Sequence, residues 1–348
     1  MALTGLEIYK HLPKTNCGDC NFPTCMAFAM QLAAKKASLD QCPHVSDEGK
    51  AALAEASAPP MKLVKIGKNS HELLIGQETV LFRHQEKFHH PTGIAVKVKD
   101  DLAEEELANR IEVINNLHFV RVGEEIGVDL IAVEHSSTSP EEYARVVKKV
   151  KETSDLPLVL LSPDPRIAEA GLEVSAERRP LIYAATGKNW QQMAPLAKKY
   201  SSSLAVKGES LEELADLTQQ IKKLGVDDLV LSVDGPQVAD TLEDLTRIRR
   251  LTLSKTFRPL GYPTITFVTE KDPFQQVAQA ATYVCKYGSI VVVEGTEPWK
   301  ILPLLTIRQN IYTDPQVPNA VEAKLYEIGH VTPQSPVLVS TNFSLSYF

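Results

Sequence analysis

The chain has 348 residues, a net charge of −7 and 43% hydrophobic residues, an ordinary composition for a water-soluble globular protein with room for two or three domains. Acidic residues outnumber basic ones by 44 to 37, and no basic stripe with interleaved aromatics is visible, which argues against a nucleic-acid binder. No apolar run is long enough for a membrane span, and no secretory signal opens the chain, so we expect a cytoplasmic protein.

Four of the five cysteines fall between residues 17 and 42, in the pattern Cys17-x2-Cys20-x4-Cys25-x16-Cys42. The fifth, Cys285, lies far away in the chain. Such crowding indicates a shared chemical role, as a disulfide framework, a zinc site or an iron–sulfur cluster. Disulfides are the weakest of these hypotheses, because structural disulfides are rare in the cytoplasm.

The cysteine spacing favours an iron–sulfur cluster over zinc. Structural zinc sites usually present two separated CxxC pairs. Here three closely spaced thiols are followed by a distant fourth. In an iron–sulfur cluster, one loop can supply three thiols that bind three of the iron atoms, and the fourth thiol binds the remaining iron. Gly18 allows the backbone to turn close to such a core, and Pro43 directly follows the last thiol. Zinc remains the open alternative.

Residues 1–58 are predicted to form a small α-helical domain around this centre. Met1–Lys10 has an amphipathic pattern, and Met26–Ser38 is rich in strong helix formers that follow a capping residue, Thr24. Ser46–Ala56 is predicted to form a further helix. So short a domain buries little apolar surface, so we expect the metal centre to supply much of its stability.

A proline-rich linker at residues 57–60 precedes a barrel domain predicted over residues 59–320. The barrel domain opens with a β-meander over residues 61–90. His89 and His90 follow it, and we expect them to lie in a loop rather than to bind metal, because adjacent histidines in a strand face opposite ways. The predicted strands of the meander are Met61–Ile66, His71–Ile75 and Glu78–Phe82.

Eight strand–helix units follow, which predicts an α/β fold with a (β/α)8 TIM barrel. The strands are short apolar runs, as in a parallel sheet covered on both faces, and no GxGxxG motif supports a dinucleotide-binding fold. The predicted strands are Ile94–Val98, Leu130–Val133, Leu158–Leu161, Leu181–Ala184, Ser203–Val206, Asp228–Val233, Thr264–Phe267 and Ile290–Val293. The predicted helices are Leu102–Asn116, Glu141–Thr153, Pro165–Ala170, Trp190–Tyr200, Leu211–Leu224, Leu242–Leu253, Phe274–Tyr287 and Trp299–Gln309.

Polar residues follow several of these strands, where the functional face of a barrel lies. They include Glu134, Asp164, Lys207, Asp234 and Glu294. An anion or pterin pocket is one interpretation, but polar caps or a protein interface fit equally well, because no nucleophile–base pair or metal triad is evident. Residues 321–348 differ in pattern: a helix over Val321–Ile328, a linker and one strand from Val337. We expect that strand to open a further domain of a longer natural protein.

The cysteine pattern, the barrel and the closing stretch PVLVSTNFSLSYF together resemble the large (gamma) subunits of corrinoid iron–sulfur proteins of the anaerobic acetyl-CoA (Wood–Ljungdahl) pathway. The resemblance covers the whole chain. It implies a [4Fe–4S] cluster on Cys17, Cys20, Cys25 and Cys42. It also implies that the closing strand is the first strand of a flavodoxin-like corrinoid-binding domain, and that Ser340, Thr341 and Ser346 are positions that approach the corrinoid (a cobamide).

The resemblance further implies a methyl carrier that takes part in carbon fixation, rather than a stand-alone enzyme. Cob(I)amide would accept a methyl group from methyltetrahydrofolate, and the cluster would return oxidised Co(II) to Co(I) with one electron. The implied partners are the small subunit in a heterodimer, the methyltetrahydrofolate:corrinoid methyltransferase, CO dehydrogenase/acetyl-CoA synthase and a low-potential electron donor such as ferredoxin. The alternatives are a pterin-dependent barrel methyltransferase with an accessory cluster, and a zinc-dependent interaction module fused to a barrel.

Overall fold

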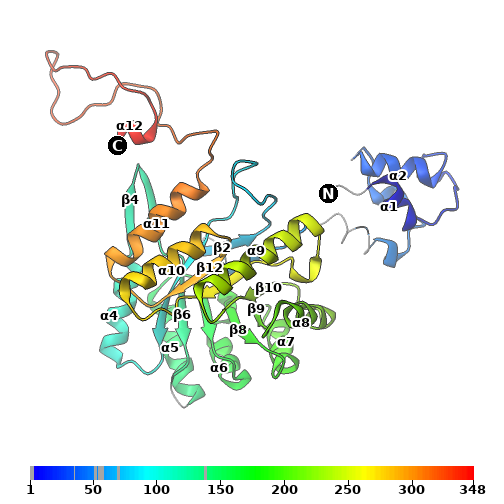
Figure 1. Ribbon diagram of the computed structural model, residues 1–348, viewed down its shortest axis with the longest axis horizontal. Coiled ribbons are helices and arrows are strands. Elements are labelled where there is room, and N and C mark those ends of the chain that lie inside the picture. The colour runs from blue at the N-terminus through cyan, green and yellow to red at the C-terminus, as the bar shows by residue number, and fades with distance from the viewer. Residues whose placement is uncertain (1–3, 35, 51–52, 54–58, 69–70, 137–138) are drawn as a thin grey trace. The chain divides into compact units, whose positions relative to one another are not determined.

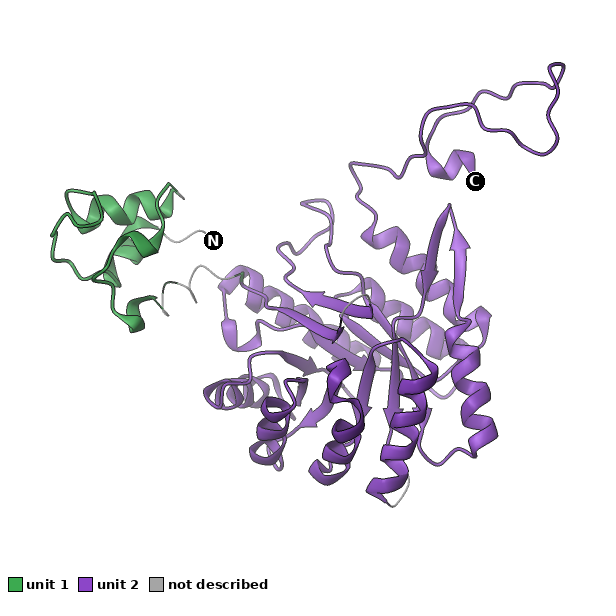
Figure 2. Cartoon of the chain, turned by 180° about the vertical axis from the view of Figure 1, so that it is seen from behind, with its two compact units in different colours: residues 1–59 green, residues 60–348 purple. Residues whose placement is uncertain are grey.

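The computed structural model describes residues 4–34, 36–50, 53, 59–68, 71–136 and 139–348. The chain divides into two compact units, unit 1 (Met1–Pro59) and unit 2 (Pro60–Phe348), as Figure 2 shows. The predicted boundary after residue 58 lies outside the described residues, and the division into three domains stays a prediction. Within the described ranges, no helix combines the length and the apolar character needed to cross a membrane.

Unit 1 is small and helical. Helix α1 (Gly5–Lys10) begins with a capping box, in which the Thr4 hydroxyl accepts the Glu7 amide and the Glu7 carboxylate accepts the Thr4 amide. Helix α2 (Cys25–Ala33) is shorter than predicted, because the amide of Lys36 bonds the carbonyl of Gln31 and closes the helix in the manner of a Schellman motif. A 3-10 turn, η1, follows at Leu39–Gln41. Residues 47–50 are helical, whereas most of the remaining predicted helix, 51–52 and 54–56, lies outside the described residues.

Unit 2 is built on a closed barrel of eight parallel strands in the order β10-β11-β12-β3-β6-β7-β8-β9, surrounded by helices (Figure 1). The strands are β3 (Gly93–Lys99), β6 (Leu130–Glu134), β7 (Leu158–Leu161), β8 (Leu181–Ala185), β9 (Ser203–Lys207), β10 (Leu229–Ser232), β11 (Thr264–Phe267) and β12 (Ile290–Val293). The helices are α4 (Glu104–Asn115), α5 (Pro140–Thr153), α6 (Pro165–Ser175), α7 (Trp190–Lys199), α8 (Leu211–Lys223), α9 (Val238–Lys255), α10 (Pro273–Cys285) and α11 (Pro298–Tyr312), with 3-10 turns η2 (Ala176–Arg178) and η3 (Arg258–Leu260). The predicted α/β class and (β/α)8 TIM barrel are confirmed.

The barrel strands are buried on both faces. On β3, Ala95 belongs to the apolar cluster that fills the barrel, whereas Ile94 and Val96 belong to the larger cluster between strands and helices. All three side chains are fully buried. This double burial explains why the strands were readable as continuous apolar runs rather than as alternating patterns.

A β-hairpin closes the N-terminal end of the barrel. Strand β1 (Leu63–Lys68) pairs with β2 (His71–Gly76), and the hairpin contributes Val64, Ile66 and Ile75 to the cluster that fills the barrel. Ser203, at the start of β9, donates its hydroxyl to the Lys65 carbonyl at 3.0 Å. Two of the three predicted meander strands are therefore confirmed.

The predicted third strand, Glu78–Phe82, is wrong. Residues 77–80 have no regular secondary structure, and a turn follows them. Glu78 is buried, and its Oε1 accepts the amides of His89 and His90 at 3.1 Å each. Its Oε2 lies 3.7 Å from Nη1 of Arg249 on α9. Side-chain contacts of Glu78 thus hold this segment in place of hydrogen bonds to a neighbouring strand. His89 and His90 lie in a loop, as expected.

A second hairpin, β4 (His118–Arg121) with β5 (Glu124–Gly127), was not predicted. Its two-residue turn places both Val122 and Gly123 at positive φ, the geometry of a type I′ turn. Such turns usually carry Asn-Gly or Asp-Gly, and valine at the first position gave no turn signal. Gln309 of α11 holds the hairpin through hydrogen bonds with Arg121 and Glu124, at 2.6 and 2.8 Å.

Residues 313–348 are mostly irregular, and two predictions there are wrong. No helix forms over Val321–Ile328, and residues 337–341 form no strand, so the opening strand of a flavodoxin-like domain is not observed. The regular structure within this described stretch is an isolated bridge between Ala320 and Phe343 and the short helix α12 (Ser344–Tyr347). Among the described residues no strand lies beside 337–341, and a strand without a partner is not stable.

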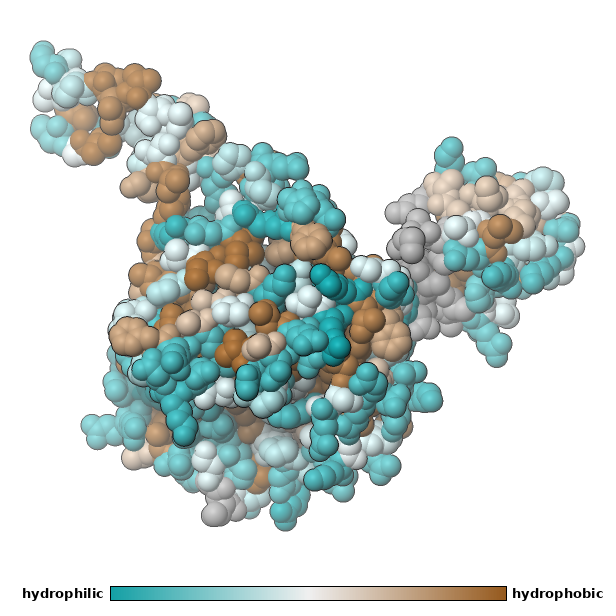
Figure 3. Space-filling model, in the orientation of Figure 1, coloured by the Kyte–Doolittle hydropathy of each residue, from teal (hydrophilic) through white to brown (hydrophobic). Residues whose placement is uncertain are grey.

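Several large apolar side chains of residues 313–348 face solvent. Leu338 and Val339 are 87% and 88% exposed, and Leu325 is 87% exposed. Figure 3 shows the corresponding hydrophobic colouring on the projecting end of unit 2. Asn319 ties this stretch to the second hairpin through a hydrogen bond to Glu124 at 2.6 Å.

Candidate metal centre

The first three cysteines of the motif lie on a loop that runs into helix α2. Cys17 and Cys20 belong to the loop, and Cys25 is the first residue of the helix. The Thr24 hydroxyl caps the helix by accepting the Ala27 amide at 3.0 Å, as predicted. The cap fixes the first turn of the helix and with it the position of the Cys25 thiol at the end of the loop.

The backbone of this loop is unusual. Lys14, Asn16, Gly18 and Asn21 all have positive φ, between 50° and 82°. Residues of left-handed conformation that interrupt ordinary ones create nests of backbone N–H groups, which occur at many iron–sulfur sites. The side chain of Asn16 reinforces the loop by accepting the Cys25 amide at 2.8 Å. Only Gly18 among these residues was expected from sequence.

Three of the four cysteines are buried in apolar surroundings. Cys20, Cys25 and Cys42 are 4–6% exposed and share one cluster with Ile8 and Phe28. Cys17 is exposed, and none of the chain's five cysteines, all of which are described, is in a disulfide. Four free thiols, three of them buried from solvent, are a donor set that fits soft metal centres such as iron–sulfur clusters.

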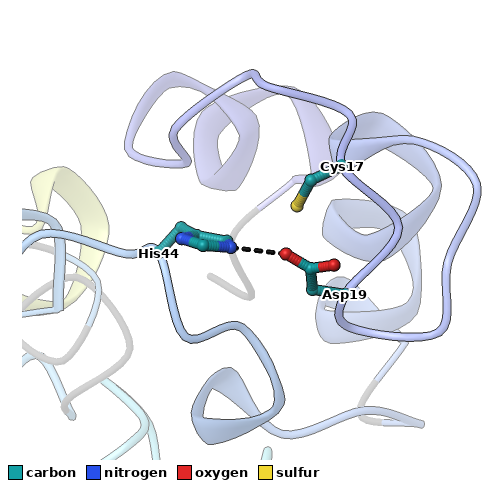
Figure 4. Close-up of side chains that lie close together, drawn as sticks. All are labelled: Cys17, Asp19 and His44. Atoms are coloured by element: carbon teal, nitrogen blue, oxygen red, sulfur yellow. Dashed lines mark hydrogen bonds and ion pairs between the residues drawn. The ribbon is translucent and has the colours of Figure 1, made fainter.

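Asp19 and His44 lie beside the exposed thiol (Figure 4). The Nε2 atom of His44 is 2.5 Å from a carboxylate oxygen of Asp19. The thiol of Cys17, a carboxylate oxygen and an imidazole nitrogen all lie within 4.8 Å of one another. Hydrogen bonds from His44 and then from Cys17 lower the pKa of Asp19 below its ordinary value. The carboxylate therefore carries its negative charge next to Cys17 at neutral pH.

The fifth cysteine is unrelated to this centre in its local structure. Cys285 is the last residue of α10 in unit 2, and burial raises the pKa of its thiol. A raised pKa reduces the thiolate fraction and hence the reactivity of this cysteine.

The three positions expected near a corrinoid lie in residues 313–348 of unit 2. Ser340, Thr341 and Ser346 are exposed. The Thr341 hydroxyl donates to the Ser346 hydroxyl at 2.9 Å, so the structure brings Thr341, which precedes α12, next to Ser346 within that helix. Their assignment to a corrinoid stays a prediction.

The charged side chains at the C-terminal end of the barrel pair with one another. Lys97 of β3 lies 3.2 Å from Glu134 and 2.5 Å from Glu294. His135 contacts the buried carboxylate of Asp100 at 2.9 Å. Each of these charged side chains therefore has a partner on this side of the barrel mouth.

The opposite side of the mouth has a second polar group. Lys207 lies 3.1 Å from Asp234, and the Tyr183 hydroxyl bonds with Ser232 at 3.1 Å and Asp234 at 3.3 Å. Burial raises the pKa of Tyr183, so its hydroxyl remains a donor. Within the described residues, the group of His, Cys, Asp or Glu side chains close enough to hold a metal ion is Cys17, Asp19 and His44, in unit 1 and not in the barrel.

Asp19, His44, Lys97 and Tyr183 are among the residues of these sites that the sequence reading missed. Asp19 and His44 carried a usable signal, since each lies within two residues of a motif cysteine. Lys97 and Tyr183 lie within barrel strands, where apolar neighbours hid them. Their position at the mouth depends on barrel closure, which sequence patterns do not reveal.

Comparison with known proteins places both units in described families. Residues 63–348 match the family "CO dehydrogenase/acetyl-CoA synthase delta subunit", and residues 12–44 match the family "Putative Fe-S cluster". A dihydropteroate synthase from Thermus thermophilus overlaps 72% of the chain and 100% of its own length at 17% identity and a TM-score of 0.47, a similarity too small to bear on function.

Curated relatives align along essentially the whole chain. The corrinoid/iron-sulfur protein large subunit of Moorella thermoacetica is 49% identical over 100% of this chain and 78% of its own length. An acetyl-CoA decarbonylase/synthase complex subunit gamma from Methanothermobacter thermautotrophicus is 37% identical over 100% of this chain and 79% of that relative. The subunit of the same name from Methanopyrus kandleri is 39% identical over 99% of this chain and 77% of that relative.

Proposed function

The chain belongs to the family of corrinoid/iron–sulfur protein large subunits, and from this membership we propose that it acts as a methyl-carrier and electron-transfer subunit. The observation that carries the proposal is the combination of similarity along the whole chain with a four-cysteine loop in the region that matches an iron–sulfur family. In this role the chain works within an assembly in the cytoplasm, rather than as a stand-alone enzyme.

Cys17, Cys20, Cys25 and Cys42 are the proposed ligands of a [4Fe–4S] cluster. The positive-φ residues of the loop, the match to an iron–sulfur family and the three-plus-one cysteine spacing support a cluster over a zinc ion. The buried thiols share an apolar cluster with Ile8 and Phe28. Such an environment stabilises the more oxidised cluster and gives a low reduction potential, suited to donating an electron.

The methyl group is proposed to travel on a corrinoid. Cob(I)amide accepts it from methyltetrahydrofolate through the methyltransferase and delivers it to acetyl-CoA synthase. The cluster supplies the single electron that reduces Co(II) to Co(I) after accidental oxidation of the cobalt. A low-potential donor such as ferredoxin then reduces the cluster again. Ser340, Thr341 and Ser346 are proposed corrinoid contacts of this chain.

A pterin-dependent barrel methyltransferase is the alternative role. The side chains at the barrel mouth give it little support, because Lys97 and Lys207 are already paired with carboxylates. Binding of methyltetrahydrofolate to this chain without its partners would favour the alternative. The methyl-carrier role predicts that the isolated chain does not bind it.

Metal analysis tests the centre directly. Chain purified without oxygen is expected to contain about four iron and four sulfide per molecule. After dithionite reduction, EPR is expected to show the signal of a reduced, paramagnetic cluster. One zinc per chain with no EPR signal on reduction would contradict the cluster proposal.

The proposed small subunit needs a docking surface on this chain, and unit 2 exposes an aromatic pair that suits one. Phe274 in the first turn of α10 and Trp299 in the first turn of α11 are 74% and 46% exposed, with ring centroids 5.2 Å apart. Exposed aromatic pairs of this kind are typical anchors of protein interfaces. We expect replacement of both by alanine to weaken small-subunit binding by about 2 kcal/mol or more, roughly 30-fold, in calorimetric titration.

Leu224, at the C-terminus of α8 and 40% exposed, provides the control for this experiment. Its replacement by alanine is expected to leave the affinity unchanged within about 0.5 kcal/mol. Equal affinity of the aromatic double variant and the wild-type chain would place the small subunit elsewhere.

A further inference from the structure

Asp19 and His44 join the two ends of the cysteine loop. Asp19 lies between Cys17 and Cys20, and His44 lies two residues after Cys42. The contact of 2.5 Å between their side chains therefore holds the segment of the last cysteine against the segment of the first two (Figure 4). Sixteen residues separate Cys25 from Cys42, so closing this loop carries a conformational-entropy cost that the contact helps to offset.

The contact lies at the accessible side of the thiol set. Cys17 is exposed, whereas the other three motif cysteines are buried. The side chains of Asp19 and His44 are about half exposed, 52% and 48%, and their polar atoms approach the Cys17 thiol within 4.8 Å. The pair thus lies beside the one motif thiol that is exposed to solvent.

We propose that Asp19 and His44 form a positioning pair that keeps the cysteine loop closed over the metal centre and sets its reduction potential. The inference rests on the proposed cluster on the four cysteines. An exposed side-chain contact contributes little to global stability, so its effect is local: it keeps the segment of Cys42 against the segment of Cys17 and Cys20. The charge of Asp19 also disfavours an added electron nearby and lowers the reduction potential.

Cluster loss and potential are the two measurements. The complete chain with its cluster is exposed to air or to an iron chelator, and the cluster absorbance is followed over time. Asp19→Ala and His44→Ala are expected to lose the cluster about tenfold faster than the wild-type chain, the scale found for groups that orient metal ligands. In an EPR-monitored redox titration, Asp19→Asn is expected to shift the reduction potential to a less negative value.

Two further variants separate positioning from general destabilisation. His44→Gln keeps a donor near the position of Nε2 and is expected to restore most of the cluster lifetime. Asp47→Asn removes an equal charge at an exposed residue of unit 1 that is not next to a motif cysteine in the sequence. Its cluster lifetime and reduction potential are expected to match those of the wild-type chain.

Wild-type lifetime and potential in both Asp19→Asn and His44→Ala would overturn the positioning role while leaving the four-cysteine cluster intact. A wild-type chain that binds zinc and no iron would instead overturn the proposed cluster, and this inference with it.

Discussion

Replacing Cys20 by alanine is expected to abolish reductive recovery of the corrinoid while leaving methyl transfer from Co(I) intact. Cys20 is buried in the apolar cluster of unit 1, and the other three cysteines of that unit are themselves proposed ligands, so its loss leaves the cluster one ligand short. If the proposed role is right, the assembled, corrinoid-loaded variant lacks the route for the electron that regenerates Co(I). Recovery from Co(II) with a low-potential donor is expected to fall to the background of a sample without the large subunit.

The same variant tests whether the two roles reside in different units. Both tryptophans of the chain, Trp190 and Trp299, belong to unit 2. Tryptophan fluorescence therefore reports the barrel alone, and its unfolding transition is expected to be unchanged in Cys20→Ala. Far-UV circular dichroism is expected to show a loss of helix, because a domain as small as unit 1 is expected to depend on its metal centre for stability.

Cys285→Ala is the matched control, since it removes a cysteine of α10 in unit 2 and no proposed ligand. It is expected to keep full iron content and a wild-type recovery rate. Undiminished recovery in Cys20→Ala, at an iron content near zero, would contradict the electron-transfer role of the cluster. Loss of methyl transfer from Co(I) in that variant would instead assign unit 1 a part in methyl carriage.

The barrel was predictable because its signals are local. Each strand is a short apolar run buried on both faces, and each helix follows with its own periodicity, so the eight units could be identified without knowing how they meet. Some helices extend beyond their predicted bounds, among them α6, to Ser175, and α9 at both ends, to Val238 and Lys255. In α6 the extension includes Gly171, where a β-carbon would approach the Tyr143 ring of α5 to 2.8 Å, a packing contact that the local pattern does not show.

The failures involve contacts distant in sequence. Glu78 was expected at the start of a strand, yet its carboxylate contacts Arg249 and accepts two amides of the following loop. The strand expected after Val337 would have required a neighbouring strand. At the metal centre, the spacing of the cysteines predicted the kind of ligand, whereas the contact between Asp19 and His44 depends on how the loop closes.

The buried pair of Glu78 and Arg249 is expected to make the largest single contribution of any ion pair to barrel stability. Both side chains are 5% exposed, and their nearest charged atoms are 3.7 Å apart. The guanidinium of Arg249 also lies 4.6 Å from the Tyr287 ring centroid. Burial lowers the pKa of Arg249 from its ordinary value, and the carboxylate of Glu78 opposes that shift and favours the charged form.

Arg249→Met is therefore expected to destabilise unit 2 by about 3–5 kcal/mol, because it leaves the Glu78 carboxylate buried without a counter-charge. Urea denaturation followed by tryptophan fluorescence measures the change. Arg247→Met on the same helix is the control, since its exposed pair with Glu243 at 3.3 Å predicts a loss within about 0.5 kcal/mol.

The double variant Arg249→Met with Glu78→Gln decides the cause of that loss. Glutamine has no charge, and its amide oxygen can still accept the amides of His89 and His90, so the double variant is expected to recover most of the stability lost by Arg249→Met. If the double variant were as unstable as Arg249→Met, the lost stability would come from the packing of Arg249 against Phe88 and Tyr287. It would then not come from an uncompensated buried carboxylate charge. Recovery would show that Arg249 stabilises unit 2 by compensating the charge of the buried Glu78 carboxylate. This interaction is found where the third strand after the hairpin of β1 and β2 was predicted.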